Sequence, residues 1–223
     1  MKRFVVACAL TGLIAAGTAC AADPEMKTDD DKTLYALGLV ISNQLASFKL
    51  TPAELELVKA GLTDGTLKKK ALVELETFGP KIKPLAEGRL AASAVEEKKK
   101  GKAFLETIAA KPKIKKTASG LLMETIAEGT GKSPEPTDKV KVNYKGTLID
   151  GKPFDSSEKH GGPSTFALTQ VMKCWTEALG LMKPGGKAKL YCPSEIAYGD
   201  RPNGEIPAGA TLVFEVELLE IVK

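Results

Sequence analysis

A set of aromatic, aliphatic and acidic side chains in the second half of the chain holds the residues best able to form a site. They lie close to predicted turns rather than in one run: Tyr144, Phe154, Asp155, Phe166, Val171, Met172, Trp175, Tyr198, Ile206 and Phe214. Such side chains line pockets that bind an apolar group by excluding water, while a few polar groups orient it. Scattered aromatic residues are also ordinary core residues, so their pattern alone leaves both interpretations open.

The sequence offers little to nucleophilic, metal or phosphate chemistry. It contains no Gly-x-Ser-x-Gly, no phosphate-binding loop ending in Gly-Lys-Ser/Thr and no dinucleotide-binding fingerprint. It has one histidine, His160, which argues against a histidine-based triad and a multi-histidine metal site. We interpret His160, which lies among charged residues and glycines, as a solvated loop side chain. We expect neither a cofactor nor a metal.

Length and composition limit the class of protein. The chain has 223 residues, of which 43% are hydrophobic, 27% charged and 5% aromatic. These values are typical of one or two domains with apolar cores and exclude a disordered or collagen-like chain. The formal net charge is +4, and it falls to +2 if a segment that contains Lys2 and Arg3 is removed. So small a charge argues against a nucleic-acid partner.

The first residues have the pattern of a secretory signal. Their start is basic, the stretch from Phe4 to Ala16 is apolar, and a small-x-small cleavage pattern ends at Ala21. We expect cleavage near Ala21 and a periplasmic or secreted mature protein. A membrane-spanning helix is the less favoured alternative, because the apolar run is short and rich in small residues. A second less favoured alternative is lipid attachment at Cys20. Gly17 argues against it, because lipid-attachment sites usually have a larger aliphatic residue at that position.

The mature chain would keep two cysteines, Cys174 and Cys192. An even pair in an exported protein is a disulfide candidate, because the compartments outside the cytoplasm tolerate disulfides. Two separate buried thiols that act as small apolar side chains are the alternative. Two cysteines do not make a metal site.

The first half of the mature chain has helical periodicity. An acidic leader ends near Asp30 or Asp31, either of which could cap a helix. Apolar residues then recur at helical spacing from Leu34 to Phe48 on more than one face, which implies a partner surface. A second helix starts at Thr51-Pro52, where the threonine can cap, the proline fits the first turn and the glutamate that follows can complete a capping box.

Two further helical patterns follow. A short one with Ala71 and Leu75 ends near Gly79-Pro80, and a long one runs from Pro84 to about Lys111. The long pattern has few apolar residues and many charges, which predicts an exposed stalk helix rather than a core element. Gly101 lies inside it and could mark a bend, because glycine lowers helix stability. These patterns predict a small all-α module.

Beyond Pro112 the periodicity changes from helix to strand. Apolar and polar residues alternate from Val140 to Lys145, and β-branched residues are frequent from Thr211 to Val222. Asp150-Gly151 predicts a tight hairpin. One helical pattern, from Val171 to Met182, occurs among these strands. We therefore predict an α+β fold for this half, with an antiparallel sheet and one short helix packed on it.

Several motifs in this half occur together in the order of one known family. They are Val142–Leu148 (VNYKGTL), Asp150–Ser157 (DGKPFDSS), Trp175, Ala197–Gly199 (AYG), Ile206–Pro207 and Ala210–Phe214 (ATLVF). On these motifs the chain from about Ser119 to Lys223 resembles an FKBP-type peptidyl-prolyl cis-trans isomerase. The helical half, which includes the segment Leu62–Gly65, is similar to the dimerisation half of secreted bacterial FKBPs of the macrophage infectivity potentiator type.

The resemblance implies a fold, domain boundaries and residue roles. It implies a signal peptide at 1–21, a helical dimerisation domain with a stalk helix at 22–115 and an isomerase domain at 116–223, in which a bent antiparallel sheet wraps around one short helix. It assigns catalytic roles to Tyr144, Asp155, Met172 and Tyr198, and substrate binding to Phe154, Phe166, Val171, Trp175, Ile206 and Phe214. Trp175 would be the floor under a proline ring. The Met172 N–H and the Tyr198 hydroxyl would hold the flanking carbonyls.

Asp155 has two possible roles under the resemblance. Held near Tyr144, its carboxylate would act electrostatically on the substrate amide, or it would serve only as a structural hydrogen-bond acceptor.

Two residues depart from the family's pattern. Cys174 stands before Trp175 where many members have glycine, and Ser164 stands at a rim position that is aromatic in well-known eukaryotic members. The substitution at Ser164 implies a more open rim. Aligned on the family, Cys192 would approach the start of the helix that carries Trp175, so the resemblance implies a disulfide between Cys174 and Cys192.

The implied function is peptidyl-prolyl isomerisation that assists the folding of exported proteins. The implied partners are proline-containing unfolded or exported proteins, a second copy of the chain bound through the N-terminal helices, and macrolide inhibitors of the FKBP class. Two alternatives remain at this point. The cleft could bind proline-containing segments without catalysis, or the helical half could act as a dimeric chaperone scaffold with an incidental isomerase.

Overall fold

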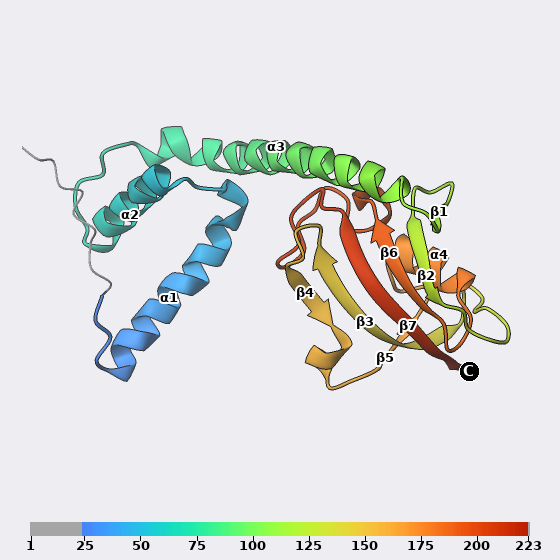
Figure 1. Ribbon diagram of the computed structural model, residues 1–223. Helices are drawn as coiled ribbons and strands as arrows, with labels where there is room; N and C mark the ends of the chain where they lie inside the picture. Colours follow the sequence, from blue (N-terminus) through green and yellow to red (C-terminus); the bar gives the residue numbers. More distant parts are fainter. Residues whose placement is uncertain (1–23, 223) are drawn as a thin grey trace, which may run out of the picture. The chain divides into compact units, whose positions relative to one another are not determined.

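The computed structural model describes residues 24–222 and divides between Gln44 and Leu45 into two compact units (Figure 1). The signal segment predicted at residues 1–21 lies outside the described residues. In the described part of the chain, no helix is both long and apolar enough to cross a membrane.

Helix α1 (Asp29–Leu45) begins with a reciprocal cap made by Thr28. The N–H of Asp31 donates to Thr28 Oγ1 at 3.1 Å, and the N–H of Thr28 donates to the Asp31 carboxylate at 2.8 Å. The prediction that Asp30 or Asp31 is the cap is therefore wrong. Asp31 instead occupies the third helical position, from which an acidic side chain reaches back to the capping residue.

Helix α2 (Pro52–Thr66) starts as the sequence predicts. The N–H of Glu54 donates to Thr51 Oγ1 at 3.3 Å, and the N–H of Thr51 donates to the Glu54 carboxylate at 2.9 Å. This capping box satisfies donors that the first turn of a helix otherwise leaves free. Between α1 and α2 lies the short helix η1 (Ala46–Phe48).

Glu54 also connects α2 to the next helix, α3 (Leu75–Ala109). It forms an ion pair with Arg89, whose guanidinium in addition donates to the Phe48 carbonyl at 2.9 Å. The hydrogen bond from Arg89 and those from Thr51 lower the pKa of Glu54 to about 2. One carboxylate thus caps α2 and fixes it to α3.

Helix α3 is continuous, although the sequence predicts two helices here. The short helix ending near Gly79-Pro80 and the separate start at Pro84 are wrong, because both prolines lie inside α3. Each proline removes the hydrogen bond to the carbonyl four residues earlier. The prolines lie in an exposed stretch of the helix, so the carbonyl groups left free remain open to solvent.

The second half of α3 packs against the sheet, contrary to the prediction of an exposed stalk. Its buried residues Ala94, Gly101 and Ile108 are spaced seven apart, so they share one face. Ile108 packs with Tyr191 and Val213 of the sheet. The sequence pattern missed this face because alanine and glycine contribute almost nothing to an apolar periodicity.

Gly101 has a packing role in place of the bend that the sequence suggested. A Cβ at this position would lie 2.2 Å from Thr211 Oγ1 and 3.0 Å from Thr211 Cβ. Atoms without a bond between them do not approach so closely, so only glycine allows α3 this distance from the sheet.

The second half of the chain forms one seven-stranded antiparallel sheet. The strands are β1 (Ile114–Lys116), β2 (Leu122–Ala127), β3 (Lys139–Leu148), β4 (Pro153–Ser156), β5 (Ser164–Ala167), β6 (Lys187–Cys192) and β7 (Leu212–Val222). Their order is β1-β2-β6-β7-β3-β4, and β5 also pairs with β3. Figure 1 shows β3 and β7 running side by side through the curved sheet. The boundary suggested by the sequence, between residues 115 and 116, falls within β1.

Helix α4 (Lys173–Leu181) packs on the sheet and completes the core, which confirms the predicted α+β fold. Leu179 of the helix and Val142 of β3 have no exposed surface. The predicted hairpin at Asp150-Gly151 is also confirmed. Gly151 has φ +87°, a left-handed conformation that suits glycine, and the Leu148 N–H donates to the Lys152 carbonyl at 2.9 Å.

Two glycines of α3 allow the packing of this helix to be tested. Gly101→Ala places a Cβ against Thr211, and overpacking of this kind costs about 1–3 kcal/mol. Gly88→Ala is the matched control, because no atom lies within 4 Å of a Cβ there, and removing glycine from a helix gains up to about 1 kcal/mol. We expect thermal unfolding to show a lower Tm for Gly101→Ala and an equal or higher Tm for Gly88→Ala. An equal increase of Tm in both variants would show that α3 does not pack on the sheet.

Candidate active site

A cavity of about 420 Å³ collects most of the side chains that the sequence singled out. Its lining is Tyr144, Phe154, Asp155, Phe166, Gln170, Val171, Met172, Trp175, Ala197, Tyr198 and Phe214. Ile206 lines a smaller adjoining pocket of about 190 Å³ together with Phe154, Asp155 and Tyr198. We call the two together the cleft. Ala197 was indicated only as part of the Ala197–Gly199 motif, and sequence reasoning missed the lining residues Gln170, Asn203, Gly204 and Glu205, whose types are common in ordinary surface loops.

A larger depression, of about 800 Å³, lies elsewhere on the sheet and shares Tyr144 with the cleft. Its border is mainly polar and charged: Asn143, Lys145, Ser156, Ser157, Glu158, Lys159, Lys187, Glu215 and Glu217. Lysine and glutamate side chains dominate its border, whereas small-ligand sites are lined mainly by aromatic and aliphatic side chains, so the smaller aromatic cleft is the better candidate.

Trp175 of α4 is the centre of the cleft. Its ring meets those of Tyr144, Phe166 and Phe214 edge to face, at centroid distances of 5.2, 5.6 and 5.3 Å. Such T-shaped pairs are the favoured aromatic geometry. The tryptophan is 4% exposed, and its Nε1–H has no hydrogen-bond acceptor among the described residues. The indole is thus held by apolar packing, without a hydrogen bond to another described residue.

Strand β3 makes room for these rings with a glycine. A Cβ at Gly146 would lie 2.6 Å from the Phe154 ring and 2.9 Å from the Phe214 ring. Phe154 and Phe214 themselves pack edge to face at 5.6 Å. The inward alternation of β3 therefore continues from Tyr144 to Gly146, and the missing side chain lets Phe154 reach over the cavity.

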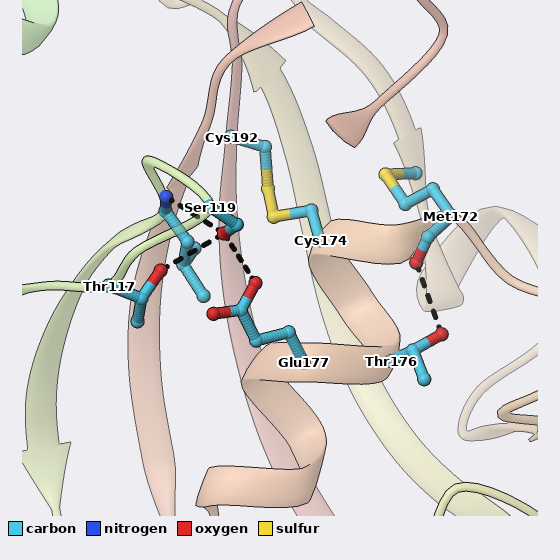
Figure 2. The surroundings of a disulfide bond; sticks show 8 residues. Thr117, Ser119, Met172, Cys174, Thr176, Glu177 and Cys192 are labelled. Carbon is cyan, nitrogen blue, oxygen red and sulfur yellow. Dashed lines mark hydrogen bonds between the residues drawn. A yellow bond between two sulfur atoms is a disulfide. The ribbon is translucent and has the colours of Figure 1, made fainter. Parts of the chain in front are cut away.

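Two donors at the edge of the cleft have no acceptor among the described residues. One is the backbone N–H of Met172, which precedes the first turn of α4. The Met172 carbonyl, by contrast, accepts from the Thr176 hydroxyl at 3.4 Å (Figure 2). The other donor is the hydroxyl of Tyr198, whose side chain is 38% exposed. A peptide bound in the cleft can use both.

Asp155 is the centre of a small hydrogen-bond network. The Tyr144 hydroxyl donates to Asp155 Oδ2 at 2.7 Å, and the Ser156 N–H donates to Oδ1 at 2.9 Å. Burial, the bond to Asp155 and the charge of that carboxylate raise the pKa of Tyr144 far above its usual value, so the hydroxyl stays protonated.

The side chain of His160 is 56% exposed, in agreement with its interpretation as a solvated side chain, but it also takes part in this hydrogen-bond network, which the sequence did not indicate. Its Nε2 lies 2.9 Å from Asp155 Oδ1. The short helix η2 (Ser157–His160) turns the histidine back over β4, a return that local sequence spacing does not reveal. Burial raises the pKa of Asp155, but the hydrogen bonds from Tyr144, His160 and Ser156 outweigh burial and lower the pKa below its usual value.

Cys174 and Cys192 form a disulfide between the first turn of α4 and the end of β6 (Figure 2). Their Cα atoms lie 5.9 Å apart, and neither residue has exposed surface. Ser119 donates to the Glu177 carboxylate beside it, which fixes the turn before β2 to the same helix. The disulfide joins the helix that carries Trp175 and follows Met172 to the strand that precedes Tyr198 in the chain.

An aromatic-lined cavity beside two donors without acceptors has the geometry that suits an apolar ring next to a peptide group. Comparisons with known proteins agree. Residues 130–219 match the family described as FKBP-type peptidyl-prolyl cis-trans isomerase, and residues 30–124 match the domain amino terminal to FKBP-type peptidyl-prolyl isomerase.

Similar proteins cover nearly the whole chain. An FKBP-type peptidyl-prolyl cis-trans isomerase FkpA of Aeromonas hydrophila is 40% identical, over 89% of this chain and 79% of its own. An outer membrane protein MIP of Legionella longbeachae is 35% identical, over 100% of this chain and 99% of its own. The crystal structure of FkpA from Escherichia coli is similar with a TM-score of 0.65 and 37% identity, covering 88% of this chain and 98% of that one. The chain therefore belongs to the FKBP-type peptidyl-prolyl cis-trans isomerases.

The hydrogen-bond network around Asp155 should make stability depend on pH. Because its folded-state pKa lies below the usual 3.8, the charged carboxylate stabilises the fold above about pH 4, and this contribution is lost as the pH falls through the folded-state pKa. We expect Asp155→Asn to lower the free energy of unfolding at pH 7 by less than about 1 kcal/mol, since the side chain is partly exposed. Urea unfolding at pH 3 should show a smaller difference between variant and parent. A difference of equal size at both pH values would contradict this assignment.

Proposed function

We propose that the aromatic cleft is where this peptidyl-prolyl isomerase binds and rotates an X-Pro bond. The observation that carries the proposal is the arrangement around Trp175, where a cavity of about 420 Å³ lined mainly by aromatic side chains lies beside the free Met172 N–H and Tyr198 hydroxyl. In this proposal Phe154, Phe166, Val171, Trp175, Ile206 and Phe214 bind the substrate. Tyr144, Asp155, Met172 and Tyr198 act on the amide and its flanking carbonyls.

The chemistry needs no covalent step. Amide resonance opposes rotation with a barrier of about 18–20 kcal/mol, and the twisted transition state has lost this resonance. The twisted amide is less polar across its C–N bond than the planar ground states, so an apolar cavity that removes water favours it. Catalysis then consists of binding the rotated geometry more tightly than the planar ones.

Each polar group has a distinct role in this proposal. The Met172 N–H and the Tyr198 hydroxyl hold the carbonyls on either side of the proline, so that one part of the peptide turns while the other is fixed. Asp155 is already bonded to Tyr144 and His160, and its carboxylate faces the amide electrostatically. A hydrogen bond made only in the rotated geometry lowers the barrier, whereas one made equally in both lowers only KM.

The alternative of a binding module without catalysis is not favoured. The relatives are named as isomerases, and the cleft keeps its aromatic floor and its two donors together. The second alternative, a chaperone scaffold with an incidental isomerase, concerns the helical half. It is compatible with isomerase activity in the second half of the chain.

We further propose a homodimer formed through the N-terminal helices, with domains at 22–115 and 116–223. The support is the exposure of α1, in which Leu34, Leu37 and Val40 are 65%, 54% and 58% exposed. Apolar side chains gathered on one helix favour a partner surface. Two clefts in one dimer would hold one unfolded chain at two points and gain avidity without new contacts.

The proposed substrates are proline-containing unfolded or exported proteins, and the proposed location is the periplasm or the exterior after cleavage near Ala21. The basic and apolar start of the chain supports export. FKBP-class macrolides are the proposed inhibitors, because they would compete for the aromatic cavity.

Substitutions in the cleft should reduce isomerisation of a short X-Pro peptide. Tyr198→Phe removes one hydrogen bond, worth about 0.5–1.5 kcal/mol, so we expect kcat/KM to fall about two- to tenfold. Phe154→Ala removes a ring over the cavity and should lower kcat/KM about tenfold or more. Tyr35→Phe and Phe78→Ala make the same chemical changes at exposed helical positions and should leave kcat/KM unchanged. Equal effects at cleft and control positions would refute the proposed site.

The dimer can be tested on the exposed face of α1. The double variant Leu34→Ser with Leu37→Ser should be monomeric by light scattering, retain activity on the short peptide and lose acceleration of the refolding of an unfolded, proline-limited protein. Asn43→Ala lies on another side of the helix and should remain a dimer. A monomeric parent protein would refute the dimer, while a monomeric variant that still accelerates refolding would refute the two-point model.

A further inference from the structure

The segment 199–210 forms one wall of the cleft and at the same time touches α3. It follows Tyr198 directly and carries Ile206, which lines the cleft with 4% of its surface exposed. Within the segment, Asn203 and Ile206 exchange N–H···O=C bonds of 3.0 and 2.9 Å, and the Ala210 N–H donates to the Pro207 carbonyl at 3.3 Å. Because the segment forms no regular helix or strand, contacts from outside add to its support, among them an ion pair between Glu205 and Lys152.

The second half of α3 supplies that support at both ends of the segment. At the first end, Lys98 forms an ion pair with Asp200, two residues after Tyr198. At the other end, Gly209 has φ +76° and lies so close to α3 that a Cβ would be 2.4 Å from the Ala94 carbonyl oxygen. The N–H of Gly209 donates to the Gly199 carbonyl at 2.8 Å, which closes the segment at its base.

The contacts occur at helical spacing along one face of α3. Ala94, Lys98 and Gly101 follow one another at intervals of four and three, and they meet Gly209, Asp200 and Thr211 in turn. The helix therefore lies along the outer side of the segment whose inner side borders the cleft. A helix that served only as a connection between two domains would not need these three contacts with the segment and the strand that follows it.

We propose that α3 is a positioning element of the isomerase, in which Lys98 and the close contact between Ala94 and Gly209 hold the segment 199–210 and so set the places of Tyr198 and Ile206. The proposal rests on the proposed function of the cleft. Lys98 touches no substrate and acts only through Asp200. Release of the segment widens the cleft and weakens binding, while the aromatic floor on α4 stays in place.

Full-length variants of the ion pair test this proposal. Lys98→Ala and Asp200→Asn should each raise KM for a short X-Pro peptide, and the Kd of an FKBP-class macrolide, about two- to fivefold, the effect of losing one partly exposed ion pair. The kcat should change much less. Fluorescence of Trp175, the only tryptophan in the chain, reports macrolide binding directly. Amide hydrogen exchange of the segment 199–210 should become faster in both variants.

Controls separate positioning from a general loss of stability. Lys100→Ala breaks another α3 ion pair, with Glu97 on the same helix, and should leave KM, Kd and exchange unchanged. The charge swap Lys98→Asp with Asp200→Lys should restore most of the lost affinity. Unchanged KM and Kd in Lys98→Ala and Asp200→Asn would overturn the proposal, as would equal effects of Lys100→Ala. A parent protein without isomerase activity would instead overturn the proposed function, and hydrogen exchange would then decide whether α3 holds the segment.

Discussion

The burial of Trp175 is the constraint on which the rest of the isomerase domain depends. The indole on α4 is 4% exposed and yet lines a cavity, so neighbouring rings must pack closely around it without filling that cavity. Tyr144, Phe166 and Phe214 do so edge to face, and they come from three different strands. The antiparallel order of the sheet brings these strands to the helix, and Gly146 leaves the space that a further side chain would fill.

The same arrangement explains how a site without a nucleophile can catalyse a reaction. Rotation needs only an environment that lowers the free energy of the twisted amide relative to the planar forms, and in the proposed site apolar rings beside two fixed donors provide one. The disulfide between Cys174 and Cys192 joins the first turn of α4, next to Met172, to the end of β6, after which the chain continues to Tyr198. It therefore matters for the geometry of the cleft as well as for the stability of the fold.

Sequence patterns predicted the strands, turns and helix starts of this structure better than they predicted which of these elements pack against one another. The alternation from Val140 to Lys145, the hairpin at Asp150-Gly151 and the capping box at Thr51 are local signals, and the structure confirms each of them. The motifs of the family named the residues that line the cleft, together with the cysteine pair.

The predictions that proved wrong or incomplete depend on long-range packing. Pro80 and Pro84 were expected to separate two helices, but tertiary contacts further along α3 and an exposed first half allow one helix. Gly101 has no local signal for its contact with Thr211, and His160 reaches Asp155 only because η2 folds back. Such contacts join residues whose spacing in the sequence carries no periodic pattern.

The most direct test of the account is a titration of the full-length mature protein with an FKBP-class macrolide, during which isomerisation of a short X-Pro peptide and the fluorescence of Trp175 are followed together. We expect the acceleration to disappear in step with the change in fluorescence, with one macrolide bound per chain. Acceleration that persists when the fluorescence change is complete would contradict the account, because catalysis would then occur outside the cleft. A folded protein that does not accelerate isomerisation at all would contradict it as well.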